Sequence, residues 1–182
     1  MMGKYPRPKS DFPSDEEFWV YHWCMEAREH GLIDEIVYQP GPFVLSPRAS
    51  VTVEKQLKTK IKTVDKFLFH KHSYTPDFSF YLQRGVLNEY FHNPVRGWVV
   101  IDVKGGFNKY GDPKQFSINC KWMWQKYEIF VEKIVPEKLF KKTWVPGICR
   151  LSPKQRKPVK KYIGVPVISE FMENQRKRLC GF

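Results

Sequence analysis

The sequence predicts an α/β protein with the element order α-β-β-β-α-β and a basic C-terminal extension. Three observations support this: a capped helical segment near the N-terminus, two strand-forming runs in the middle of the chain, and a second helical segment followed by an alternating run. The chain has 182 residues, of which 42% are hydrophobic and 16% aromatic. That length and composition favour one packed domain over disorder.

The first helix carries local start and stop signals. Residues 1–13 are rich in proline and are expected to form an extended N-terminal arm. Ser14 has the chemistry of an N-cap, and Asp15, Glu16 and Glu17 follow it in the first turn, where the helix dipole favours acids. Ser14 and Glu17 also have the spacing of a capping box. The helix is predicted to run to about His30 and to stop at Gly31.

Three strand regions are expected next. Residues 36–47 form a strand broken by Pro40 and Pro42, which indicates an edge or bulged strand. Residues 51–72 are rich in lysine and alternate weakly, so that a β-hairpin and a short helix both remain open. The runs "YTPDFSFYLQ" (74–83) and "WVVIDVKGGF" (98–107) are predicted to be strands with a long connection between them.

The second half of the pattern starts with a helix over residues 113–126. Residues 127–135 then alternate as a strand does, with Tyr127, Ile129 and Val131 on one side. These elements complete a core over residues 14–137. Residues 138–182 form the extension.

The charge is concentrated in the extension. The chain carries a formal charge of +12. Residues 138–182 contain twelve Lys or Arg against two Glu, which leaves +2 for residues 1–137. This balance indicates a polyanionic partner, with nucleic acid the first candidate and an anionic membrane surface the second.

Several classes of protein are not favoured. No apolar run approaches the roughly 20 residues of a membrane-spanning helix, and the N-terminus lacks the apolar stretch of a signal peptide. The four cysteines are scattered without metal-ligand spacing, which favours reduced thiols over a zinc site. We therefore expect a cytoplasmic protein that neither crosses a membrane nor is anchored to one, and we take nucleic acid, not a membrane, as its partner.

Each of the two central strands carries a charged group that needs a partner or a purpose. Side chains alternate along a strand, so Asp102 and Lys104 share a face and lie roughly 6–7 Å apart. If the two strands pair as antiparallel neighbours, Asp77 and Asp102 come close on that face. Adjacent carboxylates repel each other, and a divalent cation between them relieves this repulsion.

Pro76-Asp77 followed by Asp102-Val103-Lys104 resembles the PD-(D/E)xK signature of a nuclease superfamily. In "SDEEF", Glu17 matches the helical carboxylate that often completes this site. The likeness covers about residues 14–135 and extends to small phage-encoded, resolvase-type endonucleases that cut branched DNA. It implies a restriction-endonuclease-like core, in which a central mixed sheet is flanked by helices, and hydrolysis of phosphodiesters with Mg²⁺ or Mn²⁺.

The resemblance also implies roles for individual residues. Asp77, Asp102 and the Val103 carbonyl are expected to bind the metal, and Glu17 to supply a further ligand or hold a metal-bound water. Lys104 is expected to position the attacking water and to stabilise charge on the phosphate. Glu16 is the alternative to Glu17, about 100° away around the helix. One metal ion and two both remain open.

The extension is the expected contact for the DNA backbone, because its cations lie beside prolines. Its apolar residues, among them Trp144, Tyr162 and Phe171, predict that it folds against the core or against a second subunit. A resolvase needs two active sites, so the resemblance implies a homodimer. The residues expected to bind nucleic acid are Lys121, Lys154, Arg156, Lys157, Lys160 and Lys161.

The sequence thus predicts a metal-dependent DNA endonuclease that acts in phage or mobile-element DNA processing, with branched DNA as a candidate substrate. Two alternatives remain. One is a sequence-specific or transposase-associated endonuclease. The other is a nucleic-acid-binding protein that keeps the fold without the chemistry.

Overall fold

The computed structural model describes residues 7–83, 85–92, 97–105, 113–152 and 155–180. Its centre is a four-stranded mixed sheet with the order β1-β6-β7-β8. The strands are β1 (Ile33–Tyr38), β6 (Phe78–Leu82), β7 (Trp98–Val103) and β8 (Val131–Ile134). Both β1 and β7 pair with β6 in antiparallel fashion, whereas β8 is parallel to β7. The protein is therefore of the mixed α/β class, as predicted.

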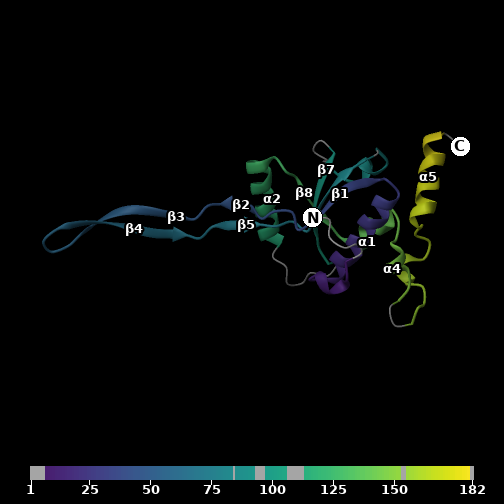
Figure 1. Ribbon diagram of the computed structural model, residues 1–182, viewed down its shortest axis with the longest axis horizontal. Coiled ribbons are helices and arrows are strands. Elements are labelled where there is room, and N and C mark those ends of the chain that lie inside the picture. The colour runs from purple at the N-terminus through teal and green to yellow at the C-terminus, as the bar shows by residue number, and fades with distance from the viewer. Residues whose placement is uncertain (1–6, 84, 93–96, 106–112, 153–154, 181–182) are drawn as a thin grey trace.

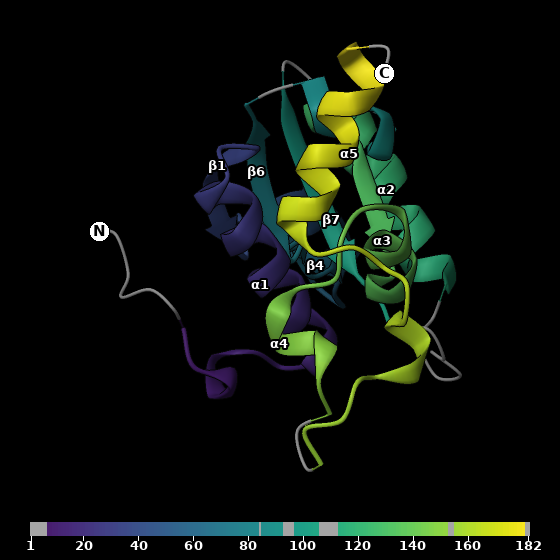
Figure 2. The same ribbon diagram turned by 90° about the vertical axis from the view of Figure 1, so that its right-hand side faces the viewer.

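Helices cover both faces of this sheet (Figures 1 and 2). The helix α2 (Pro113–Tyr127) connects β7 to β8 and lies on one face. On the other face lie α1 (Asp15–Glu29), α3 (Pro136–Lys142), α4 (Gly147–Arg150) and α5 (Ile168–Cys180). Short 3-10 helices span Lys9–Asp11, Gly85–Tyr90 and Lys160–Tyr162. None of the helices within these described ranges is long and apolar enough to cross a membrane.

Helix α1 follows its local signals closely. The Ser14 hydroxyl accepts a hydrogen bond from the Glu17 N–H at 3.2 Å, which caps the first turn. Beyond the last turn, Gly31 has a φ of 65°, a left-handed conformation that suits glycine. Trp23 is the largest fully buried side chain of this helix.

The extension packs onto the core. The Trp23 and Trp144 rings stack with centroids 4.6 Å apart, and the Trp23 Nε1–H donates to Thr143 Oγ1 at 3.0 Å. Phe140, Tyr162 and Phe171 belong to the same hydrophobic cluster. Apolar residues of the extension therefore contribute to the main core of the molecule, in line with its composition.

Some of the expected strands have different bounds. The region 36–47 is divided between β1 in the central sheet and β2 (Phe43–Ser46), which pairs with β5 (His72–Tyr74) in a separate sheet. The run 74–83 also breaks, because residues 75–77 lie between β5 and β6. The expected strand 127–135 is shorter, since α2 continues to Tyr127 and β8 starts only at Val131.

The lysine-rich region is a long β-hairpin. Strands β3 (Ala49–Gln56) and β4 (Ile61–Phe69) pair in antiparallel fashion and form what we call the ribbon, residues 49–69. The ribbon projects far from the rest of the molecule on the side of α2, with β2 and β5 at its base (Figure 1). The sequence left a hairpin and a helix open here, and the hairpin is the structure.

Candidate active site

Two carboxylates lie next to each other where β6 begins and β7 ends. Phe78 pairs with Ile101, and the Asp77 N–H donates to the Ile101 carbonyl at 3.1 Å, which places Asp77 beside Asp102. The Val103 N–H donates to Asp77 Oδ2 at 2.6 Å. Asp77 was expected in the middle of a strand. It lies instead just before β6, and a backbone N–H of β7 fixes its side chain.

The two carboxylates disfavour each other's charge. Burial raises the pKa of Asp77 to about 7, with the Asp102 charge as the second cause, and the hydrogen bond from Val103 opposes this shift. Asp102 is only 3% exposed. The pair therefore concentrates negative charge at a place with little water to solvate it.

Lys104 supplies the nearest cation. Its Nζ lies 2.5 Å from Asp102 Oδ2, although this oxygen makes no directed hydrogen bond to any described residue. The Lys104 N–H donates to the Ile134 carbonyl at 2.8 Å, which anchors the backbone at the end of β7 to β8. The ammonium group lies 5.8 Å from the centroid of the Phe116 ring. The amine is thus held beside the carboxylates, with its side chain still 31% exposed.

Glu17 reaches the same region from α1. Its side chain is buried and accepts hydrogen bonds from Tyr38 Oη at 3.1 Å and from the Ser14 hydroxyl at 3.0 Å. Its charge contributes to the raised pKa of Asp77, which places it within electrostatic reach of the carboxylate pair. The capping-box residue of α1 is therefore also a residue of the candidate site.

Glu16, the alternative to Glu17, borders the site differently. It is half-buried, and a Cβ added to Gly105 would lie 3.2 Å from Glu16 Oε1. Glu17 is the one of the two that interacts with Asp77 and Tyr38. The geometry thus favours Glu17 for the site, with Glu16 at its entrance.

A hollow of about 540 Å³ opens beside these residues. It lies between the start of α1, the end of β7 and the extension, and two cations line it, Lys104 and Lys161. The Lys161 Nζ lies 3.5 Å from Glu137 Oε2 and 5.8 Å from the centroid of the Trp19 ring. The lining residues are Ser14, Glu16, Glu17, Trp19, Val103, Lys104, Gly105, Val135, Pro136, Glu137, Lys161 and Tyr162.

The other basic residues expected to bind nucleic acid lie elsewhere. Lys121 is exposed on α2, and Arg156, Lys157 and Lys160 are exposed on the extension. None of these four lines the hollow. Lys154 lies outside the described residues. Of the predicted nucleic-acid-binding residues that the structure describes, Lys161 alone lines the hollow beside the candidate site.

Two tyrosines belong to the site and were missed in the sequence. Tyr38 holds Glu17, as described above. Tyr74, at the end of β5, has a buried hydroxyl that makes no hydrogen bond to the described residues. Burial raises its pKa, and the Asp102 and Asp77 charges add to the effect. The sequence could have indicated Tyr74, because it lies three residues before Asp77. It could not have indicated Tyr38, because only the tertiary fold brings Tyr38 to Glu17.

The predicted ligand set fits a metal ion only in part. Among the described residues, no group of three or more His, Cys, Asp or Glu side chains lies close enough together to hold an ion. Mg²⁺, however, usually keeps several waters and binds one or two carboxylates together with substrate phosphates. Asp77 and Asp102 suit that kind of coordination, because a cation between the two carboxylates would relieve the repulsion between their charges.

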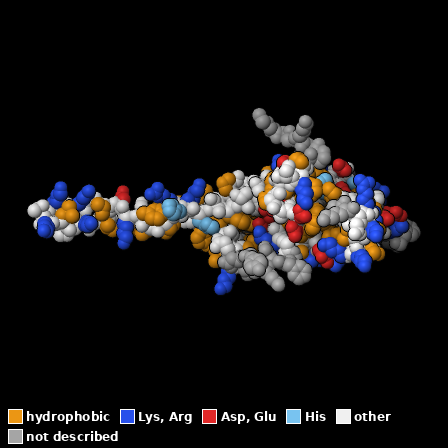
Figure 3. Space-filling view, turned by 90° about the horizontal axis from the view of Figure 1, so that it is seen from below, with side chains coloured by type: hydrophobic (Ala, Val, Ile, Leu, Met, Phe, Trp, Pro, Cys, Tyr) orange, Lys and Arg blue, Asp and Glu red, His pale blue; other side chains and the backbone are white. Residues whose placement is uncertain are grey.

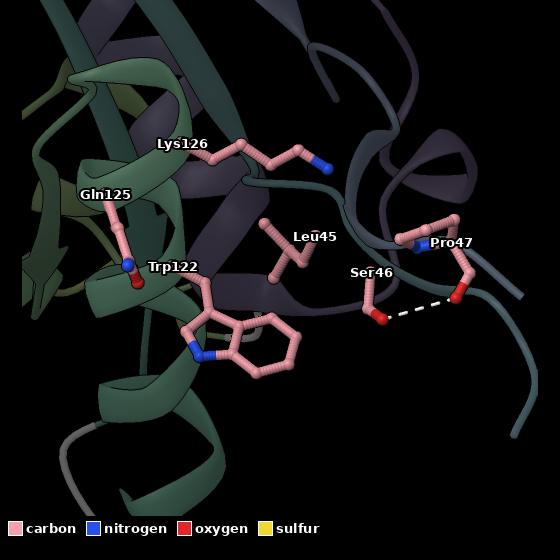
Figure 4. A pocket seen from close by; sticks show the side chains of 6 residues that line it. All are labelled: Leu45, Ser46, Pro47, Trp122, Gln125 and Lys126. Carbon is pink, nitrogen blue, oxygen red and sulfur yellow. Dashed lines mark hydrogen bonds between the residues drawn. The ribbon is translucent and has the colours of Figure 1, made fainter. Parts of the chain in front are cut away.

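A second hollow of about 380 Å³ lies at the base of the ribbon, between β2 and α2 (Figure 4). Leu45 and Trp122 line it, and Trp122 is 38% exposed. Lys126 also borders it, and its Nζ donates to the Val44 carbonyl at 2.7 Å. Lys126 thus joins α2 to the base of the ribbon.

Comparison with known proteins adds no relative. No protein-family model matches the chain, and neither a curated protein nor a solved structure matches it significantly. The functional argument therefore depends on the residues and their geometry.

Proposed function

We propose that the protein is a metal-dependent DNA endonuclease with a restriction-endonuclease-like core. The observation that carries the proposal is the placement of Asp77 beside Asp102, with the Lys104 amine 2.5 Å from Asp102 Oδ2. A buried carboxylate (Asp102) next to a half-buried one (Asp77) is costly without a bound cation, and a protein that only binds phosphates gains nothing from this pair. The central sheet also supports the proposal, since α1, the antiparallel strands β1, β6 and β7, the crossover helix α2 and the parallel strand β8 follow in the predicted order, with β2–β5 inserted between β1 and β6.

Each residue has a role that follows from its surroundings. Asp77 and Asp102 would hold Mg²⁺ or Mn²⁺, with the Val103 carbonyl as a further oxygen, and Glu17 would bind a water at the edge of the site. Such an ion, when bound, supplies activation of water and neutralisation of phosphate charge. The Tyr38 hydroxyl orients Glu17 through its 3.1 Å hydrogen bond.

Lys104 is the group that acts on the substrate directly. Asp102 fixes the position of the amine by the ion pair. An ammonium at this place orients the attacking water by hydrogen bonding and stabilises the negative charge that builds up on the phosphate. Lys161, which also lines the hollow, would contact a phosphate further along the strand.

Cleavage assays test this proposal. Supercoiled plasmid, linear duplex and a four-way junction are each incubated with the protein in Mg²⁺, in Mn²⁺ and in EDTA. We expect cleavage that requires the metal, and a loss of about 100-fold or more in Asp102→Asn, which removes a charge that the reaction needs. Asp34→Asn serves as the matched control, because Asp34 is half-exposed on β1 and does not contact Asp77.

The substrate panel separates the alternatives. Preference for the junction over the linear duplex supports the resolvase-type reading, and cutting of the linear duplex at one sequence supports the sequence-specific reading. DNA binding without cleavage in either metal, at any of the three substrates, would leave a non-catalytic binding protein and would refute the proposal.

A further inference from the structure

The two faces of the ribbon differ in charge. Residues that pair directly across an antiparallel hairpin share a face. Lys55 pairs with Lys62 and Val51 pairs with Lys66, so these three lysines lie on one face. Glu54 pairs with Thr63 and Thr52 pairs with Asp65, which places both acids of the ribbon on the other face.

The lysine face is basic without any compensation nearby. Lys55, Lys62 and Lys66 are all exposed, and none forms an ion pair with a described residue. The turn adds two more exposed lysines, Lys58 and Lys60. Residues 49–69 thus carry five lysines against two acids, a net charge of +3. Residues 1–137 as a whole carry only +2, so the ribbon is more basic than the rest of this part of the chain. Blue side chains follow the whole length of the ribbon in the space-filling view (Figure 3).

The direct pairing of Lys55 with Lys62 has an energetic meaning. Like charges opposite each other on a hairpin destabilise it, because their side chains stay within 4.5–5.5 Å at Cβ. An isolated two-stranded hairpin is marginal in water to begin with. An anionic partner on this face would remove the repulsion, whereas the same face of a second copy would increase it.

The ribbon also leads directly into the candidate active site. Strand β4 continues through His70 and Lys71 into β5, and β5 ends at Tyr74, whose hydroxyl lies beside Asp102. Asp77 follows three residues later. The ribbon is therefore joined to the carboxylate pair by a short stretch of chain, residues 70–76.

We propose that the lysine face of the ribbon binds the phosphate backbone of duplex DNA and holds it for cleavage at the Asp77–Asp102 site. This inference rests on the proposed function, because it treats the bound duplex as the substrate. The dimensions agree. The nine residues of β4 span about 30 Å at the usual rise, close to one turn of B-DNA, and a two-stranded ribbon fits the major groove.

The test measures how DNA binding depends on salt. Binding of a duplex of about 30 base pairs is titrated in EDTA, where no cleavage occurs, at several NaCl concentrations. The variant Lys55→Gln/Lys62→Gln/Lys66→Gln removes the three cations of the face. Each lost phosphate contact lowers the slope of log K against log salt by about 0.9, so that we expect a decrease of roughly 2–3.

A control triple with the same charge change isolates the ribbon. Lys138→Gln/Lys142→Gln/Arg176→Gln alters exposed residues of α3 and α5, on the face of the sheet away from the ribbon. We expect its slope to change by less than about 1. Equal slopes in the two triples would overturn the inference. It would also be overturned if the ribbon triple kept the slope of the wild type but changed its sedimentation coefficient, because the lysines would then act on self-association and not on DNA binding.

The two proposals fail in different ways. If Asp102-dependent cleavage is observed while the ribbon triple binds DNA like the control, only the ribbon inference is refuted. If the ribbon triple loses slope as expected but no substrate is cut, the DNA-binding surface stands and the endonuclease proposal is refuted.

Discussion

Asp77 is held in the folded protein where its charge is disfavoured. Burial and the neighbouring Asp102 raise its pKa to about 7 from an ordinary value of 3.8. A carboxyl whose pKa is raised on folding binds its proton more tightly in the native state than in the unfolded chain. The favourable contribution of the protonated Asp77 carboxyl to the free energy of unfolding is therefore complete below pH 4 and is lost as the pH rises toward 7. The site is therefore a source of instability at neutral pH, as expected of residues selected for function.

Removing this charge should stabilise the metal-free protein at high pH. Asp77→Asn keeps an oxygen that can accept from the Val103 N–H while it cannot ionise. We expect the variant to exceed the wild type in free energy of unfolding by on the order of 1–4 kcal/mol at pH 8, with the difference shrinking toward pH 4. Urea denaturation in EDTA across this range measures it. A difference that does not vary with pH would contradict the electrostatic account.

At the scale of elements, local signals determined what could be predicted. Ser14 and Gly31 mark the ends of α1 within a few residues of sequence, and both were identified. The sequence placed Asp77 next to Asp102 only on the condition that the two strands pair as antiparallel neighbours, and β6 and β7 do pair in this way.

What the sequence could not reveal depends on distant pairing. The segments on either side of Pro40 and Pro42 enter different sheets, which nothing in their composition distinguishes. The ribbon is exposed on both faces, so it lacks the apolar side that identifies a strand. Tyr38 was missed because its contact with Glu17 joins positions that only the tertiary fold brings together.

The packing of the extension against α1 gives a prediction at the same scale. Trp23→Ala removes a fully buried ring together with its stacking on Trp144 and its hydrogen bond to Thr143. We expect a loss of about 3–5 kcal/mol in the free energy of unfolding, in one cooperative transition followed by urea denaturation. Trp124→Ala is the matched control, because that ring is 49% exposed on α2 and should cost under about 1 kcal/mol. Two separate transitions in the wild type would show that the extension folds independently.

The molecule consists of a packed body, by which we mean the central sheet with its helices, and the projecting ribbon. The body contains the hydrophobic core and the carboxylate pair. The ribbon exposes Ile61, Phe67 and Leu68, which contribute little to burial. The lysines of the ribbon and the basic residues of the extension belong to opposite ends of the molecule, since the ribbon projects on the side of α2 while α4 and α5 lie on the other side (Figure 1).

This division predicts that the ribbon can be removed without unfolding the body. Replacing residues 49–69 with Asn-Gly joins Arg48 to His70 through a short turn, so that a six-residue loop connects Ser46 to His72 and the pairing of β2 with β5 stays in place. We expect the free energy of unfolding to change by no more than about 1 kcal/mol, because the ribbon buries almost none of the core, while duplex binding weakens by tenfold or more. Urea denaturation and DNA titration on the same preparation measure both. A loss of several kcal/mol would show that the ribbon supports the body. An unchanged fold with weakened binding would mean that its exposed apolar and like-charged residues are retained for a partner, since they bring the isolated chain no stability.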